Sequence, residues 1–497
     1  MTKHCCVLLL ALVCAGPAAA ATLAERIEAV LAGSPAGRGA FWGVQAVDLA
    51  TGKTLISLNP DRFFVPASNT KLFTTAMALT RLGPDFTFQT RVVSAAPDGA
   101  GRISGDLRLV GGGDPNLSAR PIPYQRGPIT GNPLTAIEDL ANQIAAKGVT
   151  RVDGDIIGDD TWYVWEPYAP GWAEDDPLYD YGAPVTALTV HDNTLSLHIT
   201  PGTREGDPAA LVLKPALEYY RIDNRIRTVA AGGERRIHYH RAAGSLVLDL
   251  WGTLPLHGDA EELLLGIEDP AQFAALALRQ ALEDRGIPVS GSAVACHRFP
   301  GELPNLLQGS ETETPAATEL AHRVSASLLE DLRITDKVSQ NLHAELALRA
   351  VARARRNIGS REAGLAELKD FLTEAGVAAD QYVINDGSGL SRQNLVTPST
   401  VVKLLRFMYQ SPSRKNWISL LPVGGQDGSL ASRFADTPLA GRIHAKTGSV
   451  AHVSALSGYL QRTNGDWVAF SVLVNNFNGR AGEVHDVMDH ICALIME

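Results

Sequence analysis

The pattern of hydrophobic and polar positions divides the chain into two flanking parts and a long middle part of different texture. In the first flanking part, apolar residues recur at helical spacing, then alternate with polar residues over two short runs, then return to helical spacing. Gly83-Pro84 ends the last of these segments. The predicted elements are a helix over 23–31, a hairpin of strands 41–48 and 53–58, and a helix over 71–82.

The middle part is rich in turns. Residues 86–190 carry short apolar runs separated by Gly, Asp and Pro, which predicts short strands. Residues 189–266 alternate almost throughout and predict a β-rich segment. A helix is expected over 273–285, and the polar stretch 300–315 has the composition of a junction.

The last part, from about Ala321, resumes the pattern of the first. A helix is predicted over 341–353. Residues 453–460 and 468–474 alternate and predict neighbouring strands of one sheet. The two flanking parts are therefore expected to form one unit that the middle part interrupts.

The first residues have the pattern of a secretory signal peptide. Lys3 precedes an apolar run over 5–15, and a row of alanines follows Pro17. Cleavage near Ala21 is expected to leave a periplasmic protein without a membrane anchor, because no second run of about 18 apolar residues follows. A lipoprotein cleavage at Cys14 is the alternative, which the bulky preceding Val13 disfavours.

Composition narrows the function classes further. A hydrophobic content of 45% with 20% charged residues is ordinary for a globular protein, and 497 residues suggest two to four domains. The net charge of −10 gives no basic surface for nucleic acid. After export, Cys296 and Cys492 remain. They could pair in an oxidising compartment, but two small buried hydrophobes are the favoured interpretation.

Three short motifs carry the candidate chemistry. They are Ser68-Asn69-Thr70-Lys71, Ser339-Gln340-Asn341 and Lys446-Thr447-Gly448-Ser449. A single Ser-x-x-Lys is weak evidence in a long chain, but the chain has only ten lysines and two of them lie in these motifs. Together the motifs supply the groups that an acyl-transferring serine needs.

In this interpretation Ser68 is the nucleophile, at a helix N-terminus that favours developing negative charge. Lys71 lies one turn further on the same face and is the candidate base. To accept a proton it must be neutral, so burial and a second cation, Lys446, must lower its pKa. The alternative is that Ser68 only caps a helix and Lys71 is exposed.

The other two motifs complete the expected site. Ser339 would pass a proton to the leaving amine, and Asn341 would hold Lys71 and a substrate amide. Gly448 lets a substrate backbone approach, so that the Ser449 N–H can join the Ser68 N–H in an oxyanion hole. The hydroxyls of Thr447 and Ser449 would face a substrate carboxylate, and the cation of Lys446 lies beside them. The expected catalytic residues are Ser68, Lys71, Ser339, Asn341 and Lys446, and the expected substrate-binding residues include Thr447, Gly448 and Ser449.

The spacing of the motifs predicts the domain layout. About 270 residues separate Ser68 from Ser339, so the middle part is expected to be an insertion into the catalytic domain. The predicted boundaries are a signal peptide over 1–21, a catalytic domain over 22–90 and 319–497, an inserted domain over 91–189 and 267–318, and a further β-rich domain over 190–266.

No metal or cofactor is expected. His238 and His240 alternate on a predicted strand, but no third ligand stands at a recognisable spacing. Aromatic residues and methionines are too dispersed to mark a cofactor site.

The chain resembles the low-molecular-mass class C penicillin-binding proteins, a family of D-alanyl-D-alanine carboxypeptidases and endopeptidases of the bacterial periplasm. Besides the three motifs, the segments that carry the resemblance are Gly111-Gly112-Gly113-Asp114-Pro115, Gly154-Asp155, Asp159-Asp160-Thr161, Tyr181-Gly182-Ala183-Pro184 and Asp386-Gly387-Ser388-Gly389-Leu390-Ser391-Arg392. The resemblance implies an α/β (α+β) fold of the penicillin-binding-protein and serine β-lactamase type. Its antiparallel sheet is flanked by helices, and two β-rich domains are inserted.

The resemblance also implies a function. A serine D-Ala-D-Ala carboxypeptidase or DD-endopeptidase would act on peptidoglycan stems through an acyl-enzyme at Ser68, with β-lactams as covalent inhibitors. Asp160, or alternatively Asp159, and Arg392 would bind the amine and carboxylate of a diaminopimelate side chain, with Arg392 on a flexible glycine loop.

The rival functions are a β-lactamase or esterase on the same fold, and a wall-binding module that has lost activity. The oligomeric state is not predicted.

Overall fold

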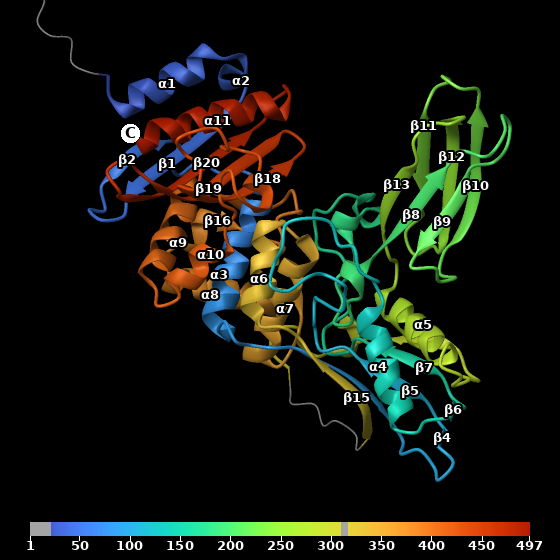
Figure 1. Cartoon of the computed structure of the whole chain (residues 1–497). Helices are drawn as coiled ribbons and strands as arrows, with labels where there is room; N and C mark the ends of the chain where they lie inside the picture. Colours follow the sequence, from blue (N-terminus) through green and yellow to red (C-terminus); the bar gives the residue numbers. More distant parts are fainter. Residues whose placement is uncertain (1–20, 310–316) are drawn as a thin grey trace, which may run out of the picture.

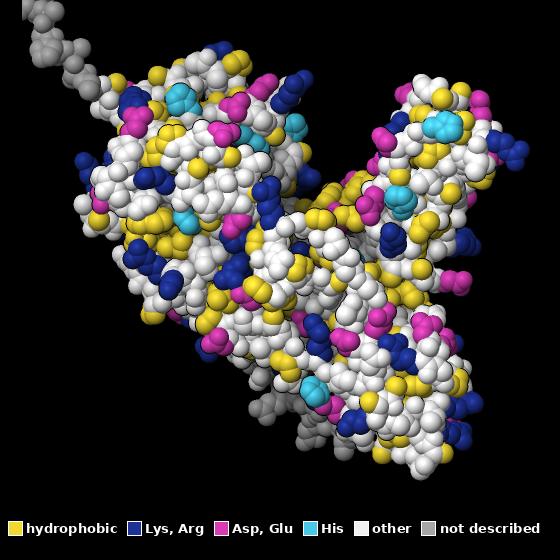
Figure 2. Space-filling model, viewed as in Figure 1, with side chains coloured by type: hydrophobic (Ala, Val, Ile, Leu, Met, Phe, Trp, Pro, Cys, Tyr) yellow, Lys and Arg dark blue, Asp and Glu magenta, His cyan; other side chains and the backbone are white. Residues whose placement is uncertain are grey.

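The computed structural model describes residues 21–309 and 317–497. The predicted signal peptide lies, apart from its last residue, outside the described residues. Within them, no helix has both the length and the apolar character needed to cross a membrane. The molecule is V-shaped, with a helix-covered sheet in one arm and a β-rich unit in the other (Figures 1 and 2).

One five-stranded antiparallel sheet joins the two ends of the chain. Its order is β18-β19-β20-β1-β2, with β1 (Phe41–Asp48), β2 (Thr54–Leu58), β18 (Ile443–Val450), β19 (Val453–Gln461) and β20 (Trp467–Asn475). The predicted hairpin forms β1 and β2, and β1 also pairs along its whole length with β20. The N-terminal and C-terminal parts therefore form one unit, and the predicted antiparallel sheet flanked by helices is confirmed.

Helices cover both faces of this sheet. Along β20, Val468, Phe470 and Val472 pack on one face, while Ala469 and Leu473 pack on the other. The first face is covered by α1 (Leu23–Gly33), α2 (Pro35–Arg38) and α11 (Ala481–Met496). On the second face, α9 (Pro398–Gln410) packs against β1, β19 and β20. The helices α3 (Thr70–Leu82), α6 (Leu328–Lys337), α7 (Asn341–Arg356), α8 (Arg361–Glu374) and α10 (Arg414–Leu420) form a bundle with α9 on this side (Figure 1).

The middle of the chain forms a second, mixed sheet in the order β14-β7-β5-β3-β15. Its strands are β3 (Gln89–Ser94), β5 (Leu107–Val110), β7 (Ile156–Asp159), β14 (Ala293–Cys296) and β15 (Thr318–Val324), and its helices are α4 (Thr135–Ala146) and α5 (Pro270–Glu283). The sequence pattern predicted α5 but not α4. Cys296, at the end of β14, and the buried Cys492 are both free.

The chain enters and leaves this mixed sheet on neighbouring strands, because β3 pairs with β15 from Gln89↔Val324 to Ser94↔Thr318. Residues 319–324, which the sequence analysis placed with the catalytic domain, therefore belong by strand pairing to the inserted sheet. Short strands β4 (Arg102–Ile103) and β6 (Arg151–Val152) pair beside it.

The β-rich unit consists of two three-stranded sheets, β10-β12-β11 and β13-β8-β9. Their strands are β8 (Thr194–Thr200), β9 (Ala210–Lys214), β10 (Arg221–Val229), β11 (Arg236–His240), β12 (Val247–Pro255) and β13 (Glu261–Gly266). None of these strands pairs with the sheet that contains β18.

Candidate active site

Ser68 lies in a short 3-10 turn, η1 (Ala67–Asn69), that leads directly into α3. Ala67 has a positive φ of 48°, a strained conformation for a residue with a side chain. Two neighbours hold the turn in place. The Asn69 amide donates to the Lys446 carbonyl at 3.0 Å. Gly389 (φ 86°) packs so closely that a Cβ there would lie 1.9 Å from the Ala67 oxygen.

Lys71 is fully buried and contacts the nucleophile. Its Nζ donates to Ser68 Oγ at 2.9 Å, to Asn341 Oδ1 at 2.6 Å and to the Ser388 carbonyl at 2.8 Å. Burial, and secondly the positive charge of Lys446, hold the pKa of Lys71 well below the ordinary range of a lysine. A neutral Lys71 at this distance is placed to accept a proton from Ser68.

Ser339 and Lys446 form the second half of the site. Ser339, at a positive φ of 65°, occupies the turn between α6 and α7. Lys446 Nζ donates to Ser339 Oγ at 2.8 Å and to the Thr447 carbonyl at 2.9 Å. The geometry thus joins Ser339 to Lys446 and Asn341 to Lys71, which gives each lysine its own polar partner.

Lys446, Thr447, Gly448 and Ser449 lie on β18, the edge strand of the catalytic sheet. A Cβ on Gly448 would lie 2.8 Å from the Pro66 oxygen and 3.1 Å from the Ser68 nitrogen, so only glycine lets the strand run this close to Ser68. The start of this edge is taken by the bridge between His444 and Val423, but the part from Lys446 onward can pair with an extended peptide, which would then lie across Ser68.

A cavity of about 550 Å³ adjoins this strand, and Thr447, Gly448 and Ser449 are part of its lining. The Thr447 hydroxyl lies 2.7 Å from the hydroxyl of Ser429, which lines the same cavity. These hydroxyls are placed to donate hydrogen bonds to an anionic group beside the nucleophile.

The glycine loop before Arg392 is pinned rather than flexible. The buried carboxylate of Asp386 accepts from the backbone N–H groups of Gly389 and Ser391 at 2.9 and 2.7 Å. Glu345, on α7, accepts from Gly387 and Ser388 at 2.8 Å each. The predicted flexibility of this loop is therefore wrong, because two buried carboxylates fix it and so position the Ser388 carbonyl on Lys71.

The insertion contacts the site through Trp172 and Tyr181, whereas the sequence suggested Asp160. The Asn341 amide donates to the Tyr181 carbonyl at 2.8 Å, and the Trp172 indole N–H donates to Asp386 at 3.0 Å. Tyr181 belongs to one of the segments that carry the family resemblance, but that resemblance assigned it no role.

Asp160 is 2% exposed, and its carboxylate is already occupied. It accepts from the Thr186 hydroxyl at 2.6 Å and lies 3.0 Å from Nδ1 of His297. His297 also lies 3.2 Å from Asp269, and hydrogen bonds to these two acids raise its pKa to about 10 against the opposing effect of burial. Asp159 pairs with Arg108 at 2.8 Å. Both carboxylates thus have partners inside the inserted domain.

Arg392 is exposed, and its backbone N–H donates to the Gly171 carbonyl at 3.2 Å. The charge of Arg392 affects the pKa of Asp176. Burial raises the pKa of Asp176, and Arg392 acts against that rise. The structure thus gives Asp176 of the insertion as an acid that the charge of Arg392 affects, whereas the partners of Asp160 are Thr186 and His297.

Asp336 is a buried acid that the motif search did not find. It is fully buried on α6, and its Oδ2 accepts from the Thr75 hydroxyl at 3.0 Å. Burial raises the pKa of Asp336, whereas the charges of Lys446 and Lys71 lower it. It is thus a buried counter-charge of both lysines, beside Asp386, whose charge acts more strongly on Lys71. Only its place three residues before Ser339 could have signalled this.

We predict that Asp336→Asn shifts the whole pH profile of kcat/KM to lower pH. Asp336 raises the pKa of Lys71 and of Lys446, so its removal lowers both. The acid limb, where Lys71 takes up a proton, and the alkaline limb, where Lys446 loses one, then move in the same direction. Initial rates between pH 5 and 10 measure this shift. Asp380→Asn, an exposed change of equal charge, is the control, and an unshifted Asp336→Asn profile would contradict the assignment.

Comparison with known proteins agrees with this geometry. The D-Ala-D-Ala carboxypeptidase 3 (S13) family matches residues 23–495. A D-alanyl-D-alanine carboxypeptidase of Actinomadura sp. (strain R39) is 37% identical over 471 residues, which cover 92% of this chain and 82% of the relative. The D-alanyl-D-alanine carboxypeptidase DacB of Haemophilus influenzae is 23% identical over 451 residues, 88% of this chain and 85% of the relative.

Solved structures support the same fold. Penicillin binding protein 4 (dacB) from Haemophilus influenzae superposes with a TM-score of 0.81 at 21% identity, covering 95% of this chain and 99% of that structure. The same protein complexed with a β-lactam gives a TM-score of 0.76 at 20% identity over 95% and 99%. The family match extends over nearly the whole chain, and the relative from Actinomadura is well above 30% identical. The chain therefore belongs to the D-Ala-D-Ala carboxypeptidase 3 (S13) family.

Proposed function

We propose that the protein removes the terminal D-Ala from peptidoglycan peptide stems and also cleaves D-Ala–diaminopimelate cross-links, through an acyl-enzyme at Ser68. The observation that carries this proposal is the contact of 2.9 Å between Ser68 Oγ and a buried Lys71 whose pKa is well below its ordinary range. A serine beside a base of this kind is an activated nucleophile.

Acylation follows from the contacts. Neutral Lys71 takes the Ser68 proton while Oγ attacks the scissile carbonyl, and the Ser68 and Ser449 N–H groups stabilise the oxyanion. Ser339 gives its proton to the leaving nitrogen and is reprotonated by Lys446, 2.8 Å away. The C–N bond breaks, the amine leaves, and water then hydrolyses the ester at Ser68.

Digestion of purified muropeptides, followed by mass spectrometry, tests the reaction and its substrate. Loss of one D-Ala from pentapeptide stems measures carboxypeptidase action, and conversion of cross-linked dimers to monomers measures endopeptidase action.

We also propose that exposed Arg392 binds the side-chain carboxylate of diaminopimelate. Stems with lysine in place of diaminopimelate should then react more slowly. Equal rates would remove Arg392 from the proposal, and unchanged muropeptides would refute the function.

Penicillin is predicted to acylate Ser68 and no other residue. The lactam carbonyl takes the place of the scissile amide, and the leaving nitrogen stays tethered, so hydrolysis of the adduct is slow. Intact-mass measurement should show one adduct, and peptide mapping should place it on the peptide that contains Ser68. An adduct elsewhere would contradict the assignment of the nucleophile, and rapid loss of the adduct would indicate a β-lactamase instead.

We further propose that the protein acts in the periplasm, after cleavage of a signal peptide over 1–21. The charged start, apolar run and alanine row of those residues support export. N-terminal sequencing of the protein from a periplasmic extract tests this, and an N-terminus at Met1 would refute it.

A further inference from the structure

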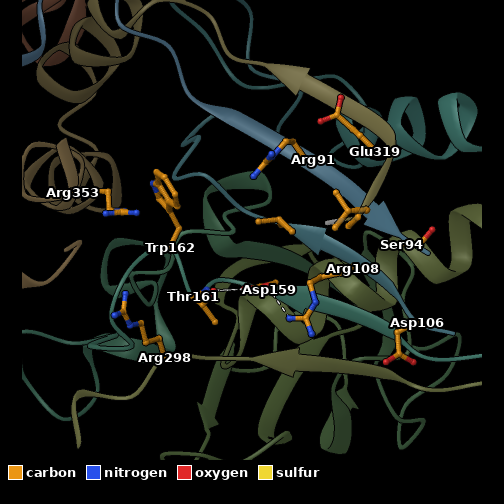
Figure 3. Close-up of a pocket in the computed structure, with 13 residues that line it drawn as sticks. Arg91, Ser94, Asp106, Arg108, Asp159, Thr161, Trp162, Arg298, Glu319 and Arg353 are labelled. Atoms are coloured by element: carbon orange, nitrogen blue, oxygen red, sulfur yellow. Dashed lines mark hydrogen bonds and ion pairs between the residues drawn. The ribbon is translucent and has the colours of Figure 1, made fainter. Parts of the chain in front are cut away.

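Within residues 21–309 and 317–497, one face of the inserted mixed sheet has no helix packed across it. Its other face carries α4 and α5, which bury Val92 and Leu109. The uncovered face presents a diagonal pattern of arginine and valine, because Arg91 pairs with Val110 and Val93 pairs with Arg108. A cavity of about 860 Å³ lies over this face (Figure 3), within the range of small-molecule sites.

Three arginines of the cavity lining surround Trp162 (Figure 3). Arg91 comes from β3, Arg298 follows β14, and Arg353 comes from α7 of the catalytic unit (Figure 3). Among the residues that the structure describes, none of these three guanidinium groups forms an ion pair, whereas the nearby Arg108 pairs with Asp159 at 2.8 Å. Asp106 lies at the end of the cavity far from Trp162, and Glu319 lies on β15, next to the strand that carries Arg91 (Figure 3).

Among the described residues, Arg353 has the clearest unused capacity to bind an anion. Its guanidinium stacks 4.1 Å from the ring of Trp162, which remains 41% exposed. Its Nε is buried and has no hydrogen-bond partner. Burial and the positive charge of Arg298 lower the pKa of Arg353. A buried guanidinium donor without a described partner, with Arg298 and Arg91 in the same cavity lining, favours binding of an anion.

The position of the cavity relates it to the active site. Arg353 and the catalytic Asn341 lie on the same helix, α7, and twelve residues at 1.5 Å each place them about 18 Å apart. Since one rigid helix contributes to both places, a polymer with repeated stems could occupy both at once. Binding at the second place would raise the effective concentration of stems at Ser68.

We propose that this arginine cavity, lined by Arg91, Arg298, Arg353 and Trp162, binds a second, carboxylate-bearing peptide stem of the same peptidoglycan. The proposal rests on the proposed function for the identity of the polymer. Guanidinium groups bind carboxylates bidentately, and an uncut stem carries several free carboxylates. The exposed ring of Trp162 offers an apolar surface for the stem beside those charges.

The test measures binding of a disaccharide-tripeptide stem, which contains no D-Ala-D-Ala bond, by isothermal titration calorimetry. Arg91→Gln with Arg298→Gln should weaken binding tenfold or more, because it removes two charge-assisted contacts. The control is Arg221→Gln with Arg227→Gln, which removes the same charge from exposed positions of β10 in the β-rich unit. The control should bind like the natural protein.

Several outcomes would overturn the proposal. They are equal binding by both double variants, equal binding of a stem whose carboxylates are amidated, or tighter binding of inorganic phosphate than of the stem. Hydrolysis of intact peptidoglycan should slow in the cavity variant, while hydrolysis of a small acyl-D-Ala-D-Ala peptide should not change. If the natural protein fails to hydrolyse that small peptide, the proposed function is wrong, and the binding comparison still decides the cavity.

Discussion

Lys71→Arg should lower the rate constant for acylation by penicillin by ~10³ or more, because both base catalysis and positioning are lost. An arginine cannot lose its proton in a protein, so it cannot accept the proton of Ser68. The Lys71 amine also lies within hydrogen-bond distance of Ser68 Oγ, Asn341 Oδ1 and the Ser388 carbonyl. A planar guanidinium cannot reproduce these three contacts. Stopped-flow or quenched-flow labelling with a fluorescent penicillin measures this rate.

Lys337→Arg is the matched control. Lys337 is 4% exposed and pairs with Asp427, and an arginine can keep that ion pair. It should change acylation by less than tenfold, and circular dichroism should show that both variants are folded. A Lys71→Arg variant that acylates at nearly the natural rate would show that another group takes the serine proton.

Gly448→Ala should reduce acylation by about 10² to 10³, the loss expected when an oxyanion-hole donor is displaced. The added Cβ would lie 2.8 Å from the Pro66 oxygen and 3.1 Å from the Ser68 nitrogen. Both contacts are with backbone, so β18 and the Ser68 turn must move apart, and with them the two donor N–H groups. Rates with penicillin and with an acyl-D-Ala-D-Ala peptide should fall together.

Gly482→Ala provides the comparison for this change. Gly482 lines the same cavity from α11, and a Cβ there would meet no atom within 4 Å. The same methyl group on the opposite wall should leave acylation close to natural. Equal losses in the two variants would mean that occupied volume, and not the position of the oxyanion hole, causes the effect.

The contact between Ser68 and Lys71 could be predicted from sequence because the two residues are close in the chain. Ser68 and Lys71 lie one helical turn apart, so Ser-x-x-Lys already places them together. The roles of Asp336 and Glu345 depend instead on tertiary burial. Each is an ordinary helix position until folding brings it against Lys446 or against the loop 386–391. No local pattern distinguishes such a residue from a solvated acid.

The expected pocket for the diaminopimelate side chain also depends on tertiary contacts that no local sequence pattern reveals. Asp160 has the charge that a pocket for an ammonium group needs, but His297, which is 137 residues away in sequence, occupies it. The glycines at 387 and 389 favoured a flexible loop, yet close packing explains them better, since a Cβ on Gly389 would collide with the Ala67 carbonyl. Helix α4 was missed because it lies in a stretch whose many turn residues favoured short strands.

The pairing of β3 with β15 also bears on the entropy of forming the active site. Bringing Ser68 to Ser339 through an unfolded connection would close a very long loop, at a cost that rises with the logarithm of its length. Once the insertion has folded, Gln89 and Val324 are held side by side. What remains to be ordered is only the short chain from Ser68 to Gln89 and from Val324 to Ser339. A large insertion on adjacent strands therefore adds little to the conformational entropy that the catalytic unit must lose.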